Sequence, residues 1–169
     1  MRLFTNNYYS YVTAATTFDD AIKLSSEASF AGVRGHLFVP NTYLEFQRVV
    51  SHGNWNQATV WLGYTDAAVE GKWVFAAGPY AGTDVSNFMW WWPGENNGGT
   101  AENCAAYGPG SYELGDIPCS HRHRYIIEFA CPFGQRFNAQ GTACVGSFMS
   151  KCSRIHLTFS HCHRSCYLL

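Results

Sequence analysis

Charge is scarce in this sequence. Charged side chains make up 14% of its 169 residues, and the formal net charge is -1. A nucleic-acid-binding domain carries clustered lysine and arginine on one face or along one helix. No basic stripe of that kind is present, so we expect no nucleic-acid partner.

Long apolar segments are also missing. No stretch is long enough to span a bilayer, and polar residues from Thr5 onward follow Met1 too soon for a signal core. We therefore expect no membrane span and no signal peptide in this chain. Seven cysteines nevertheless favour an oxidising compartment. We expect an extracellular or cell-surface protein whose sequence here is a fragment or lacks its true N-terminus, with a cytosolic protein with reduced thiols as the alternative.

Sequence motifs of catalytic sites are missing as well. No Ser/His/Asp or Cys/His arrangement has a supporting sequence motif around it. Glu70 and Glu95 are the one pair that a glycosidase hypothesis would use, and nothing in the sequence shapes a deep cleft around them. We expect that the chain is not an enzyme.

Apolar and aromatic residues are plentiful, at 47% and 17%, and suffice for a dense core in one domain with an appendage. Glu128 is the last acidic residue, and the density of cysteine rises after it. This change in composition predicts one domain over residues 1–130 and a cysteine-rich tail over residues 131–169.

The pattern of the first domain predicts two helices and several short strands. Thr17 is expected to cap a helix, and Asn41 a second one that ends at Gly53. The residues predicted to face the core are Phe18, Ala21, Ile22, Ser25 and Ala28 in the first helix and Tyr43, Phe46 and Val50 in the second. Strands are expected at 8–12, 36–39, 59–64, 72–76, 103–107 and 125–129. Short strands with two early helices and long loops indicate an α+β fold.

One segment between Trp90 and Cys119 gathers oxygen-bearing side chains on glycine-rich loops beside aromatic residues. Glu95, Asn97, Glu102 and Asp116 supply carboxylate and amide oxygens, which are the ligands that calcium requires. Oxygens fixed by such an ion can also accept hydrogen bonds from neighbouring sugar hydroxyls. The segment therefore predicts a calcium and carbohydrate site.

Five motifs occur here in a recognisable order. They are Trp61-Leu62-Gly63, Glu70-Gly71-Lys72-Trp73, Pro93-Gly94-Glu95-Asn96-Asn97, Glu102-Asn103-Cys104 and Gly115-Asp116-Ile117-Pro118-Cys119. Their order and spacing over residues 6–130 resemble those of the C-type lectin-like domain. The resemblance implies that fold, with a long loop region, and a domain that binds a glycan or glycoprotein through calcium. A Glu-x-Asn order resembles that of members which bind mannose or fucose.

The resemblance also implies disulfides. It pairs Cys104 with Cys119 across the binding loops. The segment from Cys131 to Cys144 resembles small cysteine-rich repeats that follow lectin domains, and that resemblance pairs these two cysteines. The outer bridge of the family is absent, because its two positions correspond to Ser25 and Ile127.

Two departures from the family pattern leave other interpretations open. Asn96 stands where relatives have a proline that is usually cis, and Leu114-Gly115 replaces a Trp-Asn pair that supplies an amide ligand. The loop is then equally a solvated turn kept from a sugar-binding ancestor. The alternative function is a calcium-independent protein-protein interaction module.

Several other side chains have both a functional and a structural interpretation. Trp61, Trp73 and Trp90 are expected in the core, whereas Trp91, Trp92 or Tyr107 would stack on a sugar ring or pack. His121 and His123 fall on one side of a strand, where a solvated surface is favoured over a metal site. In the tail, Cys152, His156, Cys162, His163 and Cys166 invite a zinc hypothesis, with disulfides or disorder as the favoured alternative.

Overall fold

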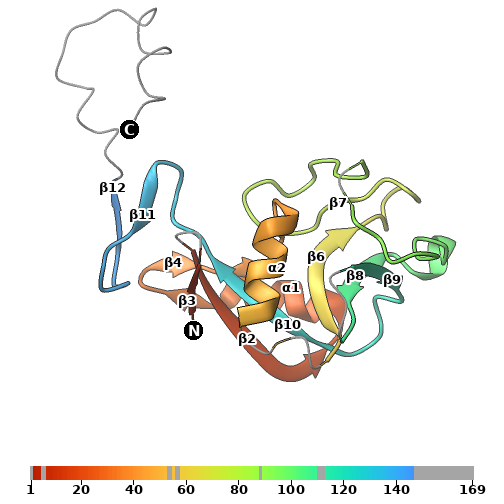
Figure 1. Cartoon of the computed structure of the whole chain (residues 1–169), viewed down its shortest axis with the longest axis horizontal. Coiled ribbons are helices and arrows are strands. Elements are labelled where there is room, and N and C mark those ends of the chain that lie inside the picture. The colour runs from red at the N-terminus through yellow and green to blue at the C-terminus, as the bar shows by residue number, and fades with distance from the viewer. Residues whose placement is uncertain are drawn as a thin grey trace, which may run out of the picture.

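The computed structural model describes residues 2–4, 7–52, 55, 58–87, 89–109 and 113–146. Two helices, a short 3-10 helix and twelve strands follow one another in this part of the chain (Figure 1). Their order is β1 Arg2–Phe4, β2 Asn7–Thr16, α1 Phe18–Glu27, β3 Ser29–Phe30, β4 Val33–Arg34, β5 His36–Leu37, α2 Tyr43–His52, β6 Val60–Thr65, β7 Val74–Phe75, η2 Gly99–Ala101, β8 Cys104–Tyr107, β9 Leu114–Ile117, β10 His123–Phe129, β11 Gln135–Phe137 and β12 Cys144–Gly146. The predicted α+β class with two helices and mixed short strands is confirmed.

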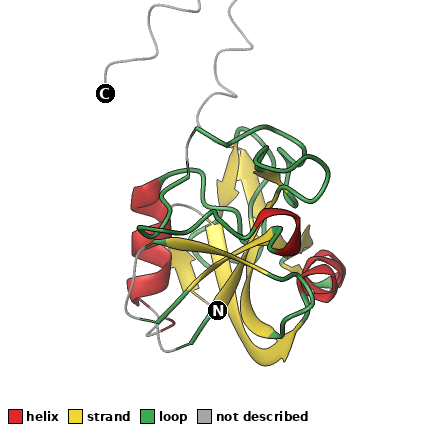
Figure 2. Cartoon of the chain, turned by 90° about the vertical axis from the view of Figure 1, so that its right-hand side faces the viewer, coloured by secondary structure: helices red, strands yellow, loops and turns green. Residues whose placement is uncertain are grey.

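The main sheet has the order β1-β2-β10-β6-β8-β9, with β5 paired to β10 and β7 paired to β6. β10 runs parallel to β6, and every other described pair in this sheet is antiparallel. Because β2 pairs with β10, the beginning and the end of the domain are held together by main-chain hydrogen bonds. Figure 2 shows α2 and α1 on opposite sides of the strands.

Helix α1 begins as the sequence predicts. The hydroxyl of Thr17 accepts a hydrogen bond from the N–H of Asp20, as an N-cap residue does. Phe18, Ala21 and Ser25 are buried, and Ile22 is half-buried against the core. The apolar stripe therefore faces the sheet.

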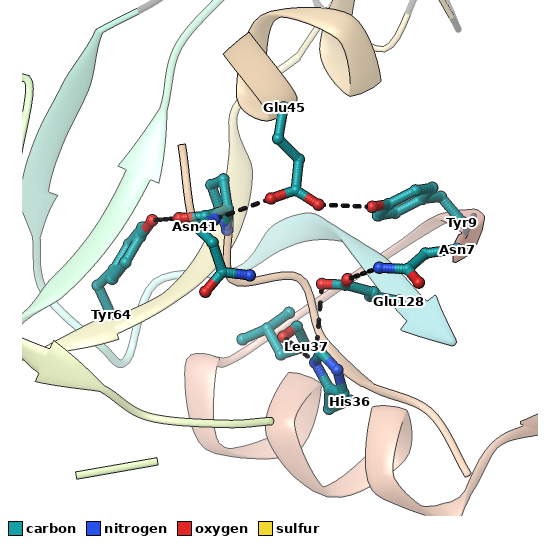
Figure 3. A network of polar contacts seen from close by, with 9 residues as sticks. Asn7, Tyr9, His36, Leu37, Asn41, Glu45, Tyr64 and Glu128 are labelled. Atoms are coloured by element: carbon teal, nitrogen blue, oxygen red, sulfur yellow. Dashed lines mark hydrogen bonds and ion pairs between the residues drawn. The ribbon is translucent and has the colours of Figure 1, made fainter. Parts of the chain in front are cut away.

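Helix α2 differs from the prediction at its first turn. Thr42, and not Asn41, is the cap, because its hydroxyl accepts from the N–H of Glu45 at 3.1 Å. The carboxylate of Glu45 accepts a hydrogen bond from the N–H of Asn41 at 2.9 Å (Figure 3), and the two bonds together resemble a capping box. Phe46 and Val50 are buried as expected, but Tyr43 is 41% exposed. The expected end at Gly53 lies outside the described residues.

Tyr43 is exposed because its inward neighbours fill the space. Its ring lies 6.3 Å from that of Phe46 and 5.5 Å from that of Trp90, so it covers these side chains from outside. The prediction that Tyr43 points into the core is wrong. Tyr43 therefore lies at the edge of the apolar stripe of α2, where it keeps contact with solvent.

The strand predictions are right in position and differ in length. β2 extends to Thr16, and β5 ends at Leu37 although residues 38–39 were expected to continue it. Of the strand expected over residues 72–76, only Val74 and Phe75 form β7, and Val74 also forms an isolated bridge with Asp84. The loops between β6 and β8 gather beyond the sheet at the end away from β11 and β12 (Figure 1).

The core is continuous across helices and sheet. Its largest fully buried side chains include Trp61, Trp73, Tyr64 and Phe38. Ser25 and Ile127 are both buried, and a β-carbon added at Gly35 would lie 2.8 Å from the carbonyl of Ser25 and 2.6 Å from a methyl group of Ile127. The two positions of the missing outer bridge therefore lie on either side of Gly35.

The predicted pair Cys131–Cys144 forms a disulfide that joins the two sides of the β11–β12 hairpin. Phe137 in this hairpin is buried, and its ring lies 4.8 Å from Tyr8 and 5.9 Å from Phe30. Residues 147–169, with the tail cysteines and histidines that were weighed as zinc ligands or as disulfide partners, lie outside the described residues. In the described part of the chain, every helix is too short or too polar to cross a bilayer.

Candidate functional site

The aromatic segment Trp90–Trp92 lies beside β9. The N–H of Leu114 donates to the Trp90 carbonyl at 3.0 Å, and the N–H of Trp92 donates to the Leu114 carbonyl at 2.8 Å. A turn follows, in which the N–H of Glu95 donates to the Trp92 carbonyl at 2.9 Å. Gly94 has a φ of 94°, which suits the third position of a type II turn after proline. Pro93-Gly94 is therefore the local signal that brings Glu95 back over the sheet.

Asp116 holds the next part of this loop. Its buried carboxylate accepts hydrogen bonds from the backbone N–H groups of Asn96 and of Gly98, the latter at 3.0 Å. The indole N–H of Trp73 donates to the side-chain oxygen of Asn96 at 2.9 Å. Asn96, where relatives have proline, has a left-handed φ of 62°, which asparagine tolerates better than most residues. Asp116 and Trp73 together fix the loop 95–98.

Three of the predicted ligands form an acidic cluster at this point. Asp116 and Glu102 both act on Glu95, because partial burial, then Asp116, then Glu102 raise the pKa of the Glu95 carboxyl. Two glycines leave room for these groups. A β-carbon would lie 3.0 Å from a Glu95 oxygen at Gly115, and 2.1 Å from a Glu102 oxygen at Gly98.

The fourth predicted ligand, Asn97, forms a contact of its own within the loop. The side-chain amide of Asn97 donates to the Gly94 carbonyl and is exposed. Gly115 has no side chain that could supply the amide ligand found in relatives, and Glu95 occupies the space that such a side chain would need. Among the described residues, no three acidic, histidine or cysteine side chains converge in a geometry suited to a metal ion. Calcium ligation by Glu95, Asn97, Glu102 and Asp116 remains a prediction.

A groove of about 400 Å³ opens next to the cluster. Trp92, Glu95, Pro109 and Glu113 line its walls, and its floor includes Leu114. We call it the Trp92 groove. Neither Pro109 nor Glu113 was singled out from the sequence, because their place in the groove depends on how β8 and β9 pair.

The structure separates the candidate aromatic platforms. Trp92 is 50% exposed, whereas Tyr107 is fully buried and Trp91 packs its ring 4.6 Å from that of Trp73. Trp61 and Trp73 are in the core as expected, and Trp90 is half-buried against it. Trp92 is therefore the one member of the predicted trio that offers its ring to a ligand.

The remaining predicted features have structural roles. Cys104 and Cys119 form the predicted disulfide, with their α-carbons 5.2 Å apart, and it ties β8 to the residues that follow β9. His123 packs its ring 4.9 Å from that of Trp61, while His121 is exposed. Burial and then His121 lower the pKa of His123, so this ring is a neutral packing partner.

Comparison with known proteins gives one family model, described as the Lectin C-type domain, which matches residues 25–129. Over 105 residues the chain is 34% identical to tetranectin of Mus musculus, and over 102 residues it is 32% identical to C-type lectin domain family 3 member A of Bos taurus. These alignments cover 57% and 58% of this chain but 48% and 49% of the relatives. The chain thus spans about half the length of these curated relatives.

Solved structures show the same fold at lower identity. The carbohydrate-recognition domain of mouse scavenger receptor C-type lectin has a TM-score of 0.63 and 22% identity, and the alignment covers 78% of this chain and 94% of that one. A calcium-independent type II antifreeze protein also has a TM-score of 0.63 and 22% identity, with coverage of 76% and 90%. The fold is therefore shared by solved domains whose names indicate different ligands.

Proposed function

This chain belongs to the C-type lectin domain family, whose members are non-enzymatic binding domains, and from that premise we propose that it is an extracellular carbohydrate-binding module. The Trp92 groove is the proposed binding site, and a terminal monosaccharide is the proposed ligand. The family and the fold support a binding domain. The groove supports the choice of a sugar.

The half-exposed ring of Trp92 beside a carboxylate is the observation that carries this proposal. A pyranose has an apolar C–H face that packs on an aromatic ring, and hydroxyls at its edge that donate hydrogen bonds. In the Trp92 groove the indole provides the flat surface, and Glu95 lies within the same walls as an acceptor. A rigid turn carries both groups, so little order has to be gained on binding.

Calcium binding by Glu95, Asn97, Glu102 and Asp116, with a mannose- or fucose-type sugar, is the finer form of this proposal. The mutual effect of the three carboxyls on Glu95 supports it, because a cation would relieve their repulsion. Asp116 is engaged by the backbone of the loop, and Asn97 donates to the Gly94 carbonyl through its amide nitrogen and not through the oxygen that would ligate calcium. The stacking proposed for Trp92 does not itself require the metal, so the calcium-dependent form is tested separately.

A calcium-independent protein-interaction module is the second candidate. The observation that favours it is an apolar surface at the start of α2, where Tyr43 and Leu44 are 41% and 54% exposed. Tyr43 lies against Trp90, so this surface adjoins the aromatic segment of the candidate site. A partner protein would cover both.

Export from the cytosol is part of the main proposal. Both described disulfides support it, because such bonds persist in oxidising compartments. Peptide mapping of protein from its native source under non-reducing conditions should recover Cys104 linked to Cys119. Free thiols at both positions would contradict export.

Glycan-array binding of the wild-type protein and of four variants tests the Trp92 groove. We expect Trp92→Ala and Trp92→Leu to weaken binding by roughly tenfold, about 1.4 kcal/mol, because both remove the flat aromatic face. Trp92→Tyr should keep most of the affinity, and Val69→Ala, an exposed apolar change elsewhere, should keep all of it. Equal binding by Trp92→Leu and Trp92→Tyr would show that stacking is not the interaction.

Calorimetry in calcium and in chelator separates the finer alternatives. If calcium is a ligand of the cluster, it should raise the melting temperature, and Glu95→Gln should weaken both calcium and sugar binding. Sugar binding that is unchanged in chelator would exclude the calcium-dependent form and leave the Trp92 groove standing. An array without any bound glycan, together with a protein ligand lost on Tyr43→Ala, would favour the second candidate.

A further inference from the structure

The charges of this chain are unevenly distributed along its sequence. The stretch from Trp73 to His121 carries five of the twelve acidic residues and none of the eleven lysines and arginines. The rest of the chain therefore has more basic than acidic residues, although the net charge of the whole is -1. This acidic stretch supplies every described residue that lines the Trp92 groove except Thr59.

Two carboxyl groups line the Trp92 groove. Glu95 lies over Gly115, where a β-carbon would stand 3.0 Å from one of its oxygens, and the main-chain N–H of Asp116 hydrogen-bonds its carboxylate. Glu113 comes directly before β9. Both glutamates are partly exposed, so a ligand in the groove can reach them.

Basic side chains do not balance these two carboxylates. Among the described residues, the lining of the Trp92 groove includes no lysine, arginine or histidine. The first two arginines after β9 have partners elsewhere, because Arg122 donates to the Ala15 carbonyl at 3.1 Å and Arg124 donates to the Tyr11 hydroxyl at 3.2 Å. A concave surface lined by charges of one sign concentrates the electrostatic potential. The Trp92 groove is therefore a negatively charged site.

Carboxyl groups next to the groove strengthen this charge. Partial burial, then Asp116, then Glu102 raise the pKa of Glu95. The shift means that these neighbours make ionisation of Glu95 less favourable. A positively charged ligand in the groove would offset that repulsion.

Trp92 supplies the other contact that such a ligand needs. Its ring is 50% exposed and lines the same groove. An indole attracts an ammonium group that lies over its face, and it also packs against the apolar face of a sugar. A neutral sugar gains only the packing, whereas a sugar with an ammonium group also gains from the charge of the groove.

We propose that the Trp92 groove selects its ligand by charge and takes an amino sugar with a free ammonium group, an inference that rests on the carbohydrate-binding function proposed above. The ring of the sugar packs on Trp92, and its ammonium lies in the field of Glu95 and Glu113. A neutral sugar of the same shape binds more weakly because it has no charge. A uronic acid is repelled by both carboxylates. Glu113 is thus a specificity-determining residue.

Titration calorimetry of the wild-type protein in chelator tests this with three methyl glycosides: the glucosaminide, the glucoside and the glucuronide. At about pH 6.5 they are a cation, a neutral sugar and an anion with the same ring. We expect the amine to bind about tenfold more tightly than the neutral sugar, and the acid to bind more weakly than either. The preference for the amine should shrink when salt is raised from about 50 mM to about 500 mM, because exposed charges are then screened.

A pair of variants assigns the selectivity to the groove. Glu113→Gln should lower the ratio of amine affinity to neutral-sugar affinity by a few fold and should raise the relative affinity of the uronic acid. Glu27→Gln, at an exposed acid on α1, is the matched control and should leave both ratios as they are. Equal ratios in the two variants would overturn the role of Glu113. The salt dependence needs no variant and is independent of folding defects.

The outcomes separate this inference from the function on which it rests. Equal binding of the amine and the neutral sugar, or a preference that does not change with salt, would overturn charge selectivity and leave the carbohydrate function standing. Binding of the three sugars in calcium alone would also overturn it, because the metal would then neutralise the carboxylates. No binding of the amine would overturn the inference whatever the glycan array shows, and the proposed function fails only if the array is empty as well.

Discussion

Individual carboxyl groups in this domain show how position changes the chemistry of one residue type. Asp116 is buried yet fully engaged by the backbone of the loop 95–98. Glu45 is likewise buried and hydrogen-bonded through both oxygens. Glu128 differs, because burial and then Glu45 raise its pKa to about 8, and hydrogen bonds from Asn7, the Val39 N–H and Tyr9 oppose this only in part.

Stability should therefore fall as the pH rises through the range set by Glu128. Its pKa is about 8 when folded and 4.5 in the absence of the fold, so the folded state holds the extra proton between these values. Its contribution is complete below pH 4.5 and is lost as the pH approaches 8, with a slope of at most ~1.4 kcal/mol per pH unit. His36 has a lowered pKa and destabilises only below its ordinary value of 6.5. Between pH 6.5 and 8 the decline belongs to Glu128.

Urea unfolding at several pH values across that window measures the effect. Glu128→Gln should flatten the profile, because an amide does not titrate. Glu70→Gln, at an exposed acid, serves as the control and should leave the slope as it is. A slope that survives in Glu128→Gln would contradict the assignment.

At the scale of elements, the start of α2 joins local and tertiary structure. Thr42 caps the helix, and Glu45 in its first turn connects the helix to Tyr9 in β2 and to the chain at Asn41. A carboxylate in the first turn also suits the helix dipole. One short segment thereby fixes the position of α2 over the core and places Tyr43 beside Trp90.

Substitution of the N-cap residue of α2 should lower the stability of the domain, whereas substitution of the residue before it should not. Thr42→Ala removes the acceptor for the Glu45 N–H and should lower the free energy of unfolding by ~1 kcal/mol. Asn41→Ala is the matched control, because only the backbone N–H of Asn41 takes part in the described bond. Chemical unfolding measures the free energy of unfolding of both variants. An equal loss in Thr42→Ala and Asn41→Ala would contradict the assignment of Thr42 alone as the cap.

At the scale of the whole molecule, the β11–β12 hairpin lies against the start of β2 and against β3. The ring of Phe137 packs against those of Tyr8 and Phe30, which also contact each other, and a β-carbon at Gly141 would collide with the hydroxyl of Tyr8. The domain boundary expected near residue 130 remains a prediction. These contacts give it a direct test.

Phe137→Ala should lower the free energy of unfolding of the domain by ~3 kcal/mol, as truncation of a buried phenylalanine does. Phe133→Ala is the matched control in the same segment, because Phe133 is 99% exposed, and it should change stability by no more than ~0.5 kcal/mol. Tryptophan fluorescence reports the unfolding of the core around Trp61. An unchanged core transition in Phe137→Ala would show that the hairpin is energetically separate.

Features that depend on neighbours in the sequence were predictable from the sequence alone. The cap at Thr17 and the α+β class follow from local patterns, the family follows from the order of short motifs, and both disulfides follow from resemblances to known domains. Such signals survive because capping, turn formation and apolar periodicity act over a few residues. They placed Glu95, Glu102 and Asp116 in one region of the molecule.

The use of each side chain was decided by the tertiary structure. Asp116 meets the N–H of Asn96 across 20 residues and Trp73 meets Asn96 across 23, so no local pattern shows that these groups hold the loop. Trp91 is covered by Trp73 while the adjacent Trp92 is left open to solvent, and Glu128 is isolated from water by strands and a helix far from it in sequence. Burial and hydrogen-bond partners come from long-range packing, and these set both the exposed platform and the shifted pKa.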